Sequence, residues 1–210
     1  MDLSAAERQR LCDLFESVGP DAPTLCEGWT TRDLAAHLVL REYLPLASVG
    51  AVLPPAAPLT DRVQAGLAAR PFEELVAKVR SGPPLWSPFR LPGVGSRANL
   101  AEYYVHHEDV RRAAGGGARS DAPELDGPLW STLRSSLWLL TRHVKGIELR
   151  LVRPDGEELV AKQGSGPVVT VRGTPRELLV YMHGRQNAAD VDLAGDPAAV
   201  AAFRATRLGV

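Results

Sequence analysis

The hydrophobic period of the chain changes at Lys145-Gly146, and this change most constrains the fold. Before this point apolar residues recur at three- and four-residue spacing, as in segment 128–144, which predicts amphipathic helices. After it, Ile147 to Val152 alternates in the manner of a strand. Helices followed by strands are typical of an α+β protein. We therefore predict a helical domain over residues 1–145 and a small α+β domain over residues 146–210.

Helix-start patterns divide the first domain into segments. Ser4 with Glu7, and Thr30 with Asp33, have the spacing of a capping box, in which a side chain satisfies free backbone N–H groups at a helix start. These patterns predict one helix from Ser4 to about Val18 and a second that opens at Thr30. Further helices are predicted at about 60–70, 72–81, 99–114 and 128–144, with connectors at 50–60 and 82–95. The second connector is rich in proline and glycine and carries Trp86 and Phe89, which suits the wall of a substrate site.

The second domain shows short strands separated by turns. Strands are predicted at 147–152, 158–162, 168–171 and 190–193, a helix from Pro175 to about Gly184, and an alanine-rich helix after Pro197.

The composition excludes several classes of partner. Lys and Arg total 24 against 25 Asp and Glu, a net charge of −1, so the basic footprint of a nucleic-acid-binding protein is absent. No apolar run reaches the roughly 18 residues of a membrane span, and no signal-peptide pattern opens the sequence. Cys12 and Cys26 form no disulfide framework or zinc motif, and Cys12 lies on the apolar face of a helix. We expect a soluble cytoplasmic protein; the composition does not predict its oligomeric state.

The run Glu-Tyr-Tyr-Val-His-His-Glu-Asp at 102–109 carries the strongest functional signal. Glu102 and His106 are four residues apart and therefore share one helix face. His37 interrupts an apolar stripe of its own helix and is the best third ligand. Three protein ligands of this kind leave room on a divalent ion for water or substrate, as in a catalytic site.

Three neighbouring side chains have less defined roles. His107 lies about 100° around the helix from His106 and is predicted to lie at the surface or to support a ligand. Asp109 could orient the imidazole of His106, or it could pair with a nearby arginine at the surface. Trp29 is expected to pack at the entry of the second helix as a hydrophobic staple.

Two ordered motifs resemble a known family. The motifs are Trp29-Thr-Thr-Arg-Asp-Leu-Ala-Ala-His37-Leu and Glu102-x-x-x-His106-x-x-Asp109. Together they resemble the mycothiol-dependent maleylpyruvate isomerase family of actinobacteria, within the DinB-like superfamily. The resemblance implies a DinB-like four-helix bundle, a small sterol-carrier-like α+β domain, and zinc held by His37, Glu102 and His106. It also implies mycothiol as a cofactor whose thiol the metal activates.

The segment from Gly173 to Arg185 looks like the helix of the sterol-carrier-like domain with its Gly-Arg end, and Arg185 matches an arginine that contributes to activity in the isomerase. By this resemblance the chain is a thiol-dependent isomerase or transferase that acts on a small electrophile, with maleylpyruvate as one analogue. Two alternatives stay open: a metal-dependent hydrolase on the same bundle, and a non-enzymatic metal-bearing protein that binds a lipid or another small molecule.

Overall fold

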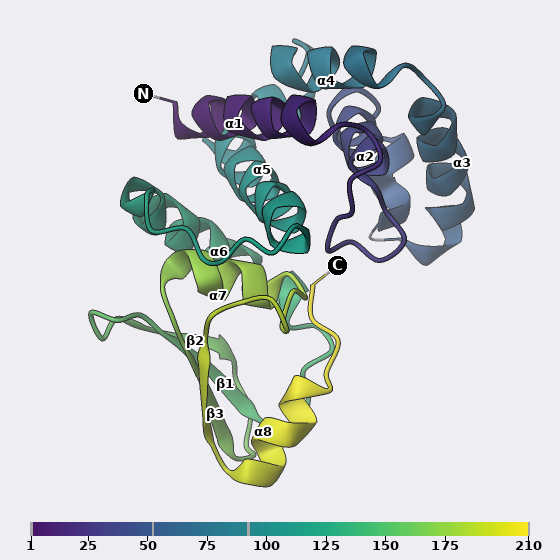
Figure 1. Cartoon of the computed structure of the whole chain (residues 1–210). Helices are drawn as coiled ribbons and strands as arrows, with labels where there is room; N and C mark the ends of the chain where they lie inside the picture. The colour runs from purple at the N-terminus through teal and green to yellow at the C-terminus, as the bar shows by residue number, and fades with distance from the viewer. Residues whose placement is uncertain (1, 52, 92, 210) are drawn as a thin grey trace. The chain divides into compact units, whose positions relative to one another are not determined.

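The chain divides into two compact units, Met1–Gly117 and Ala118–Val210 (Figure 1). The computed structural model describes residues 2–51, 53–91 and 93–209. The division falls at Gly117, and not near residue 145, where the change of period predicts it. The reason is helix α6 (Asp126–Leu140), which packs against helix α7 (Pro175–Met182) and strand β2 (Glu158–Lys162). A helical period reports local structure and does not reveal which element a helix packs on.

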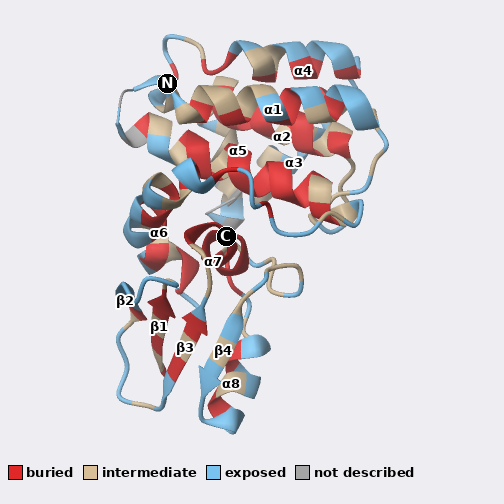
Figure 2. Cartoon of the chain, turned by 60° about the vertical axis from the view of Figure 1, so that its left-hand side comes forward, coloured by how far each residue is buried: buried red, intermediate tan, exposed pale blue. Residues whose placement is uncertain are grey.

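Helices build the first unit. They are α1 (Leu3–Val18), α2 (Thr31–Tyr43), α3 (Ala57–Ala68), α4 (Phe72–Ser81) and α5 (Val94–Ala113), with short 3-10 turns at Ala47–Ala51, Pro54–Ala56 and Pro88–Arg90. Helix α1 packs against α4 and α5, and α2 packs against α3 and α4. The buried stripes of these helices face one another (Figure 2). Leu11, Phe15, Leu34, Leu38 and Leu75 are fully buried in this core.

The helix starts agree only in part with the sequence predictions. Helix α1 is capped by Asp2, whose Oδ1 accepts a hydrogen bond from the backbone N–H of Ser4 at 3.0 Å, so Ser4 lies inside the helix and is not its cap. The predicted box at Thr30 is present, because Oδ2 of Asp33 accepts from the backbone N–H of Thr30 at 2.9 Å. Helix α5 begins at Val94, before the predicted start near Asn99.

The second unit is built on a four-stranded mixed sheet of order β2-β1-β3-β4. Its other strands are β1 (Glu148–Val152), β3 (Val168–Arg172) and β4 (Asp192–Gly195), and the final helix is α8 (Pro197–Arg204). Strands β1 and β2 form an antiparallel hairpin, β1 and β3 run parallel, and β4 returns antiparallel to β3. Leu149, Leu151, Val169 and Val171 are fully buried on one face. The α+β class predicted from the sequence is therefore confirmed.

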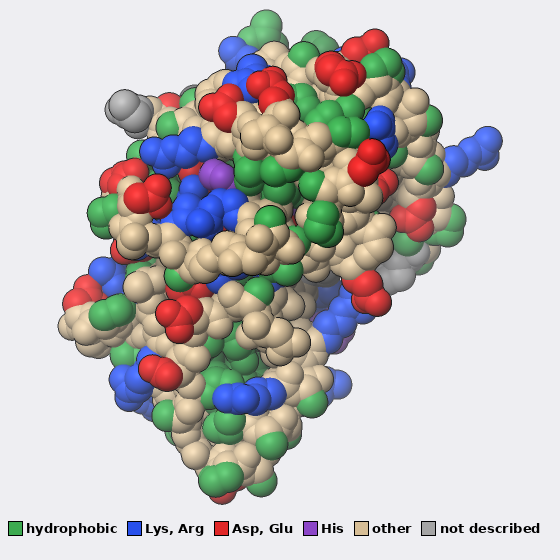
Figure 3. Space-filling view, viewed as in Figure 1, with side chains coloured by type: hydrophobic (Ala, Val, Ile, Leu, Met, Phe, Trp, Pro, Cys, Tyr) green, Lys and Arg blue, Asp and Glu red, His purple; other side chains and the backbone are tan. Residues whose placement is uncertain are grey.

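Within the part of the chain that the structure describes, no helix combines the length and apolar character that crossing a bilayer requires. Acidic and basic side chains are interspersed on the face drawn in Figure 3.

Candidate metal centre

Side chains from α2 and α5 converge on one carboxylate oxygen. Oε1 of Glu102 lies 3.1 Å from Nε2 of His37 and 3.2 Å from Nε2 of His106. One ligand atom from each of the three residues falls within 4.8 Å of the others. Two imidazole nitrogens and a carboxylate oxygen are a common donor set for zinc and related divalent ions. The structure thus brings the three predicted ligands together in a group that could hold a metal ion.

Local helix geometry and the packing of α2 on the same site produce this arrangement. Glu102 and His106 project from one face of α5 because they are four residues apart. The His37 and His106 rings meet edge to face, with centroids 5.3 Å apart. The Trp29 ring lies 5.2 Å from the His37 ring, so the predicted helix-entry residue also forms a wall of the candidate centre.

Asp109 supports His106 from the opposite side of the imidazole. Its Oδ2 lies 2.9 Å from Nδ1 of His106, and the carboxylate is fully buried. An N–H at Nδ1 that donates to Asp109 leaves Nε2, on the side of Glu102, as the nitrogen whose lone pair a metal ion would use. Of the two roles predicted for Asp109, the structure therefore shows the one in which it orients the ring.

Cys26 adds a second group of potential ligands. Its Sγ donates to Oδ2 of Asp109 at 3.3 Å, and Cys26, His106 and Asp109 also have ligand atoms within 4.8 Å of one another. This group would use Nδ1 of His106, whereas the group with His37 and Glu102 uses Nε2. A neutral imidazole carries a proton on one of its two nitrogens. When a metal ion takes the place of the proton on Nε2, the short contact between Nδ1 and Asp109 keeps the remaining proton on Nδ1, which favours the group at Nε2 over the group at Nδ1 as the candidate centre.

Burial and neighbouring polar or charged groups shift the pKa values of the site residues in opposite directions. Burial alone would raise the pKa of Glu102, but Arg41 and the two histidines outweigh it and hold that pKa well below its ordinary value. Burial lowers the pKa of His37 despite its contact with Glu102. For His106, burial is outweighed by hydrogen bonds with Asp109, Cys26 and Glu102, which raise its pKa well above the usual value. Glu102 is thus an anion, ready to bind a cation.

Arg41 is a site residue that the sequence analysis did not identify. Its Nε lies 3.5 Å from Oε2 of Glu102, on the side away from the imidazoles. Arg41 follows His37 by four residues on α2 and therefore shares its face. The same spacing rule that pairs Glu102 with His106 could have found it.

The structure corrects the surface position predicted for His107 and leaves the predicted role of Arg185 untested. His107 is buried, and its Nδ1 lies 2.8 Å from Oε1 of Glu7 on α1, so the expected surface position is wrong. The cause is that α1 packs along α5 and covers this side of the helix. Arg185 belongs to the second unit, where its Nη1 donates to the backbone carbonyl of His183 at 2.6 Å. A catalytic role for Arg185 stays a prediction.

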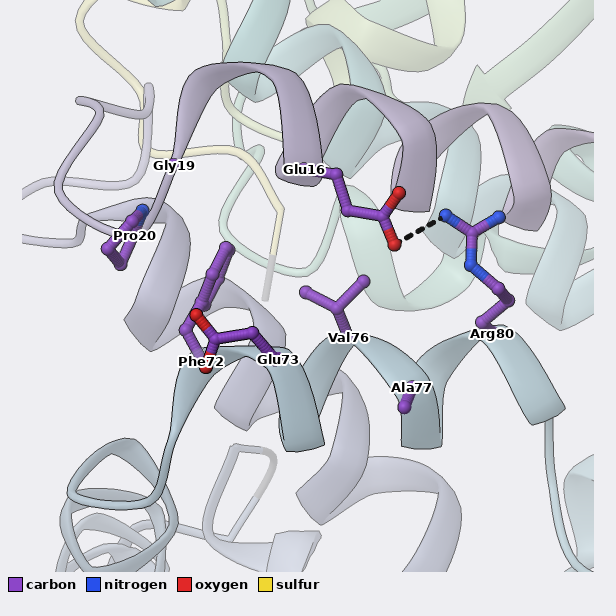
Figure 4. A pocket seen from close by; sticks show the side chains of 8 residues that line it. All are labelled: Glu16, Gly19, Pro20, Phe72, Glu73, Val76, Ala77 and Arg80. Atoms are coloured by element: carbon purple, nitrogen blue, oxygen red, sulfur yellow. Dashed lines mark ion pairs between the residues drawn. The ribbon is translucent and has the colours of Figure 1, made fainter.

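A hollow of about 320 Å³ lies elsewhere in the first unit, between α1 and α4 (Figure 4). Phe72 and Val76 contribute apolar surface to it. Its arginine, Arg80, is already paired with Glu16 at 2.9 Å and with Asp13 at 2.8 Å. The lining includes none of the three candidate metal ligands, and its charged groups offer no comparable convergence, so this hollow is not part of the candidate metal centre.

Comparison with known proteins gives a structural match. No protein-family model matches the chain, and no curated protein matches it in sequence. The structure superposes on the crystal structure of a mycothiol-dependent maleylpyruvate isomerase with a TM-score of 0.59, at 18% identity, over 91% of this chain and 89% of that chain. The chain shares the fold of that isomerase. A histidine-to-alanine mutant of the isomerase gives a TM-score of 0.52 at 17% identity, over 90% of this chain and 89% of that one. The resemblance seen in the sequence motifs is thereby confirmed as a likeness of fold.

Proposed function

We propose that this protein is a divalent-metal-binding enzyme that uses mycothiol as an isomerase or thiol transferase on a small electrophilic substrate. The observation that carries the proposal is the position of Glu102 Oε1 between Nε2 of His37 and Nε2 of His106, with Asp109 on the far nitrogen of His106. The likeness of fold to a mycothiol-dependent maleylpyruvate isomerase supports it.

The residues present fit a resident zinc ion. His37, Glu102 and His106 would hold it, and Asp109 would keep the proton on Nδ1 of His106 so that Nε2 stays a ligand. The chemistry that a bound divalent ion would supply there is ionisation of a coordinated thiol, whose thiolate would be the nucleophile. Arg185 would steady an anionic group of the substrate.

The chain's own cysteines do not offer an alternative nucleophile. Cys12 is fully buried, and burial raises the pKa of its thiol to about 12, so it stays protonated at neutral pH. Cys26 donates its thiol to the carboxylate of Asp109 at 3.3 Å, so its sulfur is already engaged in a hydrogen bond. A reaction that needs a thiolate would therefore take it from a small-molecule thiol.

The finer assignments belong to the same proposal. The first unit would be a DinB-like four-helix bundle, the second a sterol-carrier-like domain, and the protein a cytoplasmic actinobacterial enzyme. Its partners would be a small-molecule substrate and the thiol cofactor, with no nucleic acid or membrane involved.

Elemental analysis combined with a calorimetric titration of mycothiol tests the proposal. We expect about one zinc ion per chain, as a three-ligand site requires, and thiol binding that is lost on chelation. His106→Ala should lose the metal, whereas His143→Ala, at an exposed position in the second unit, should retain it. Undiminished zinc in His106→Ala would defeat the ligand assignment. Metal without thiol binding would favour a hydrolase that activates water, and saturable lipid binding without metal would favour a non-enzymatic binding protein.

A further inference from the structure

Arg41 lies beside Glu102, and neighbouring residues enclose most of its side chain. Its side chain is only 11% exposed. Its Nε lies 3.5 Å from Oε2 of Glu102, and its Nη1 donates to Oδ1 of Asn99 at 2.7 Å. The ring of Phe89 covers one face of the guanidinium, with its centroid 3.7 Å from Cζ. A guanidinium held at two edges and covered on one face is fixed in position.

Asn99 ties this arrangement to the segment that precedes α5. Its Nδ2 donates to the backbone carbonyl of Phe89 at 2.8 Å, while its Oδ1 accepts from Arg41. Phe89 therefore contacts the network twice, through its ring and through its backbone. The proline-rich connector that the sequence predicts as a substrate wall is joined in this way to a candidate metal ligand.

The two oxygens of Glu102 have different partners. Oε1 faces Nε2 of both histidines, and Oε2 faces Arg41. A carboxylate can bind a metal ion through one oxygen or through both. An arginine on Oε2 competes with the metal for that oxygen and neutralises part of its charge. This competition leaves Oε1 as the metal-binding oxygen.

We propose that Arg41 is a positioning residue that holds Oε2 of Glu102, limits the carboxylate to one metal bond, and links the Phe89 segment to the metal centre. The inference rests on the proposed metal centre. One carboxylate bond in place of two leaves one more position on the ion open to thiol and substrate. A substrate that binds against the Phe89 segment would then change the coordination of the metal ion by moving Arg41.

Titration of the metal-free protein with Co²⁺ tests the inference, because its visible absorption reports coordination number. Arg41→Gln removes the charge and the stacking cation. We expect it to bind Co²⁺ on the order of 10-fold more tightly, because the charge of Oε2 is no longer neutralised and that oxygen can also bind the ion. Its visible bands should also weaken, because a second oxygen bond raises the coordination number. A purely structural role for Arg41 would not move this spectrum. Arg41→Lys, which keeps the charge, should stay closer to the affinity and spectrum of the wild type.

Arg32 offers a matched control. It lies on the same helix, its guanidinium lies over the Phe72 ring at 5.9 Å, and its Nη1 donates to the backbone carbonyl of Arg70. Arg32→Gln should keep the wild-type Co²⁺ affinity and spectrum. A wild-type protein that binds no Co²⁺ would refute the metal centre itself. Wild-type affinity and spectrum in Arg41→Gln would refute only the positioning role.

Phe89→Leu keeps the inference testable if the Arg41 variants do not fold. It removes the ring from the guanidinium but leaves the backbone carbonyl that Asn99 contacts. We expect the same spectral change to a smaller degree, with circular dichroism unchanged. A spectrum identical to that of the wild type would overturn the link between this segment and the metal centre.

Discussion

Replacement of Glu42 by glutamine should change how the stability of the first unit depends on pH. Glu42 lies on α2 and is fully buried, and Tyr103 donates its hydroxyl to Oε1 of Glu42 at 2.6 Å. Among the described residues no hydrogen-bond partner reaches Oε2. Burial is the largest influence and raises the pKa of Glu42 to about 7 from 4.5, although Tyr103 and two arginines oppose it. The folded protein therefore holds a proton that the unfolded chain releases.

The direction and size of the effect follow from these two pKa values. Between pH 4.5 and 7 the folded state binds more protons at Glu42 than the unfolded state, so the free energy of unfolding falls as pH rises through this window. This loss of stability, caused by ionisation of the buried carboxyl group, is absent well below pH 4.5 and complete above pH 7. Its limit is about 3 kcal/mol, and the part that falls between pH 5 and pH 8 is about 2–3 kcal/mol.

Urea denaturation of the wild type and Glu42→Gln at pH 5 and pH 8, followed by tryptophan fluorescence with chelator present, measures the effect. Glutamine can still accept from Tyr103, and any cost of its unpaired amide N–H group is the same at both pH values. The free energy of unfolding of the variant minus that of the wild type should therefore be about 2–3 kcal/mol larger at pH 8 than at pH 5. Glu74→Gln, at an exposed position on α4, should show no such gain. A difference between the wild type and Glu42→Gln that does not change with pH would refute the reasoning.

Three further substitutions test other parts of the first unit. Asp109→Asn should weaken zinc binding about 10-fold or more, because the amide can donate to Nδ1 of His106 and so move the ring proton to Nε2. Competition with a chromophoric chelator measures the zinc affinity, and an unchanged affinity would contradict this prediction. Gly82→Ala should lower the free energy of unfolding by about 1–3 kcal/mol, because Gly82 has φ +77° and ψ −179°, a conformation that side chains disfavour. Gly66→Ala, in open space within α3, should instead be neutral or stabilising by up to about 1 kcal/mol in the same urea titration. Equal effects of the two glycine substitutions would show that backbone conformation is not the cause.

Features that depend on neighbouring residues could be predicted from the sequence. The shared face of Glu102 and His106 follows from helix geometry alone, and the cap formed by Thr30 with Asp33 follows from a short motif. The start of α1 was placed wrongly because Asp2 also offers a capping oxygen, and the sequence pattern does not decide between two caps so close together.

Features that depend on packing between helices could not be predicted in this way. Cys26 reaches Asp109 across 83 positions of the sequence, and His107 reaches Glu7 across 100. No local period encodes either contact. The predicted boundary near residue 145 differs from the observed one at Gly117 for the same reason, since α6 is helical in its own sequence but packs against β2 and α7 through tertiary contacts.

The distance along the chain between His37 and Glu102, 65 positions, has a thermodynamic consequence. In an unfolded chain these two ligands are rarely close, so an ion at the proposed centre would bind the folded state far more tightly than the unfolded one. Mass action then adds about 2.7 kcal/mol to the free energy of unfolding at a free metal concentration one hundred times the dissociation constant. The stability of the helical unit would thus follow the metal supply of the cell, and metal starvation would lower the amount of folded protein as well as its activity.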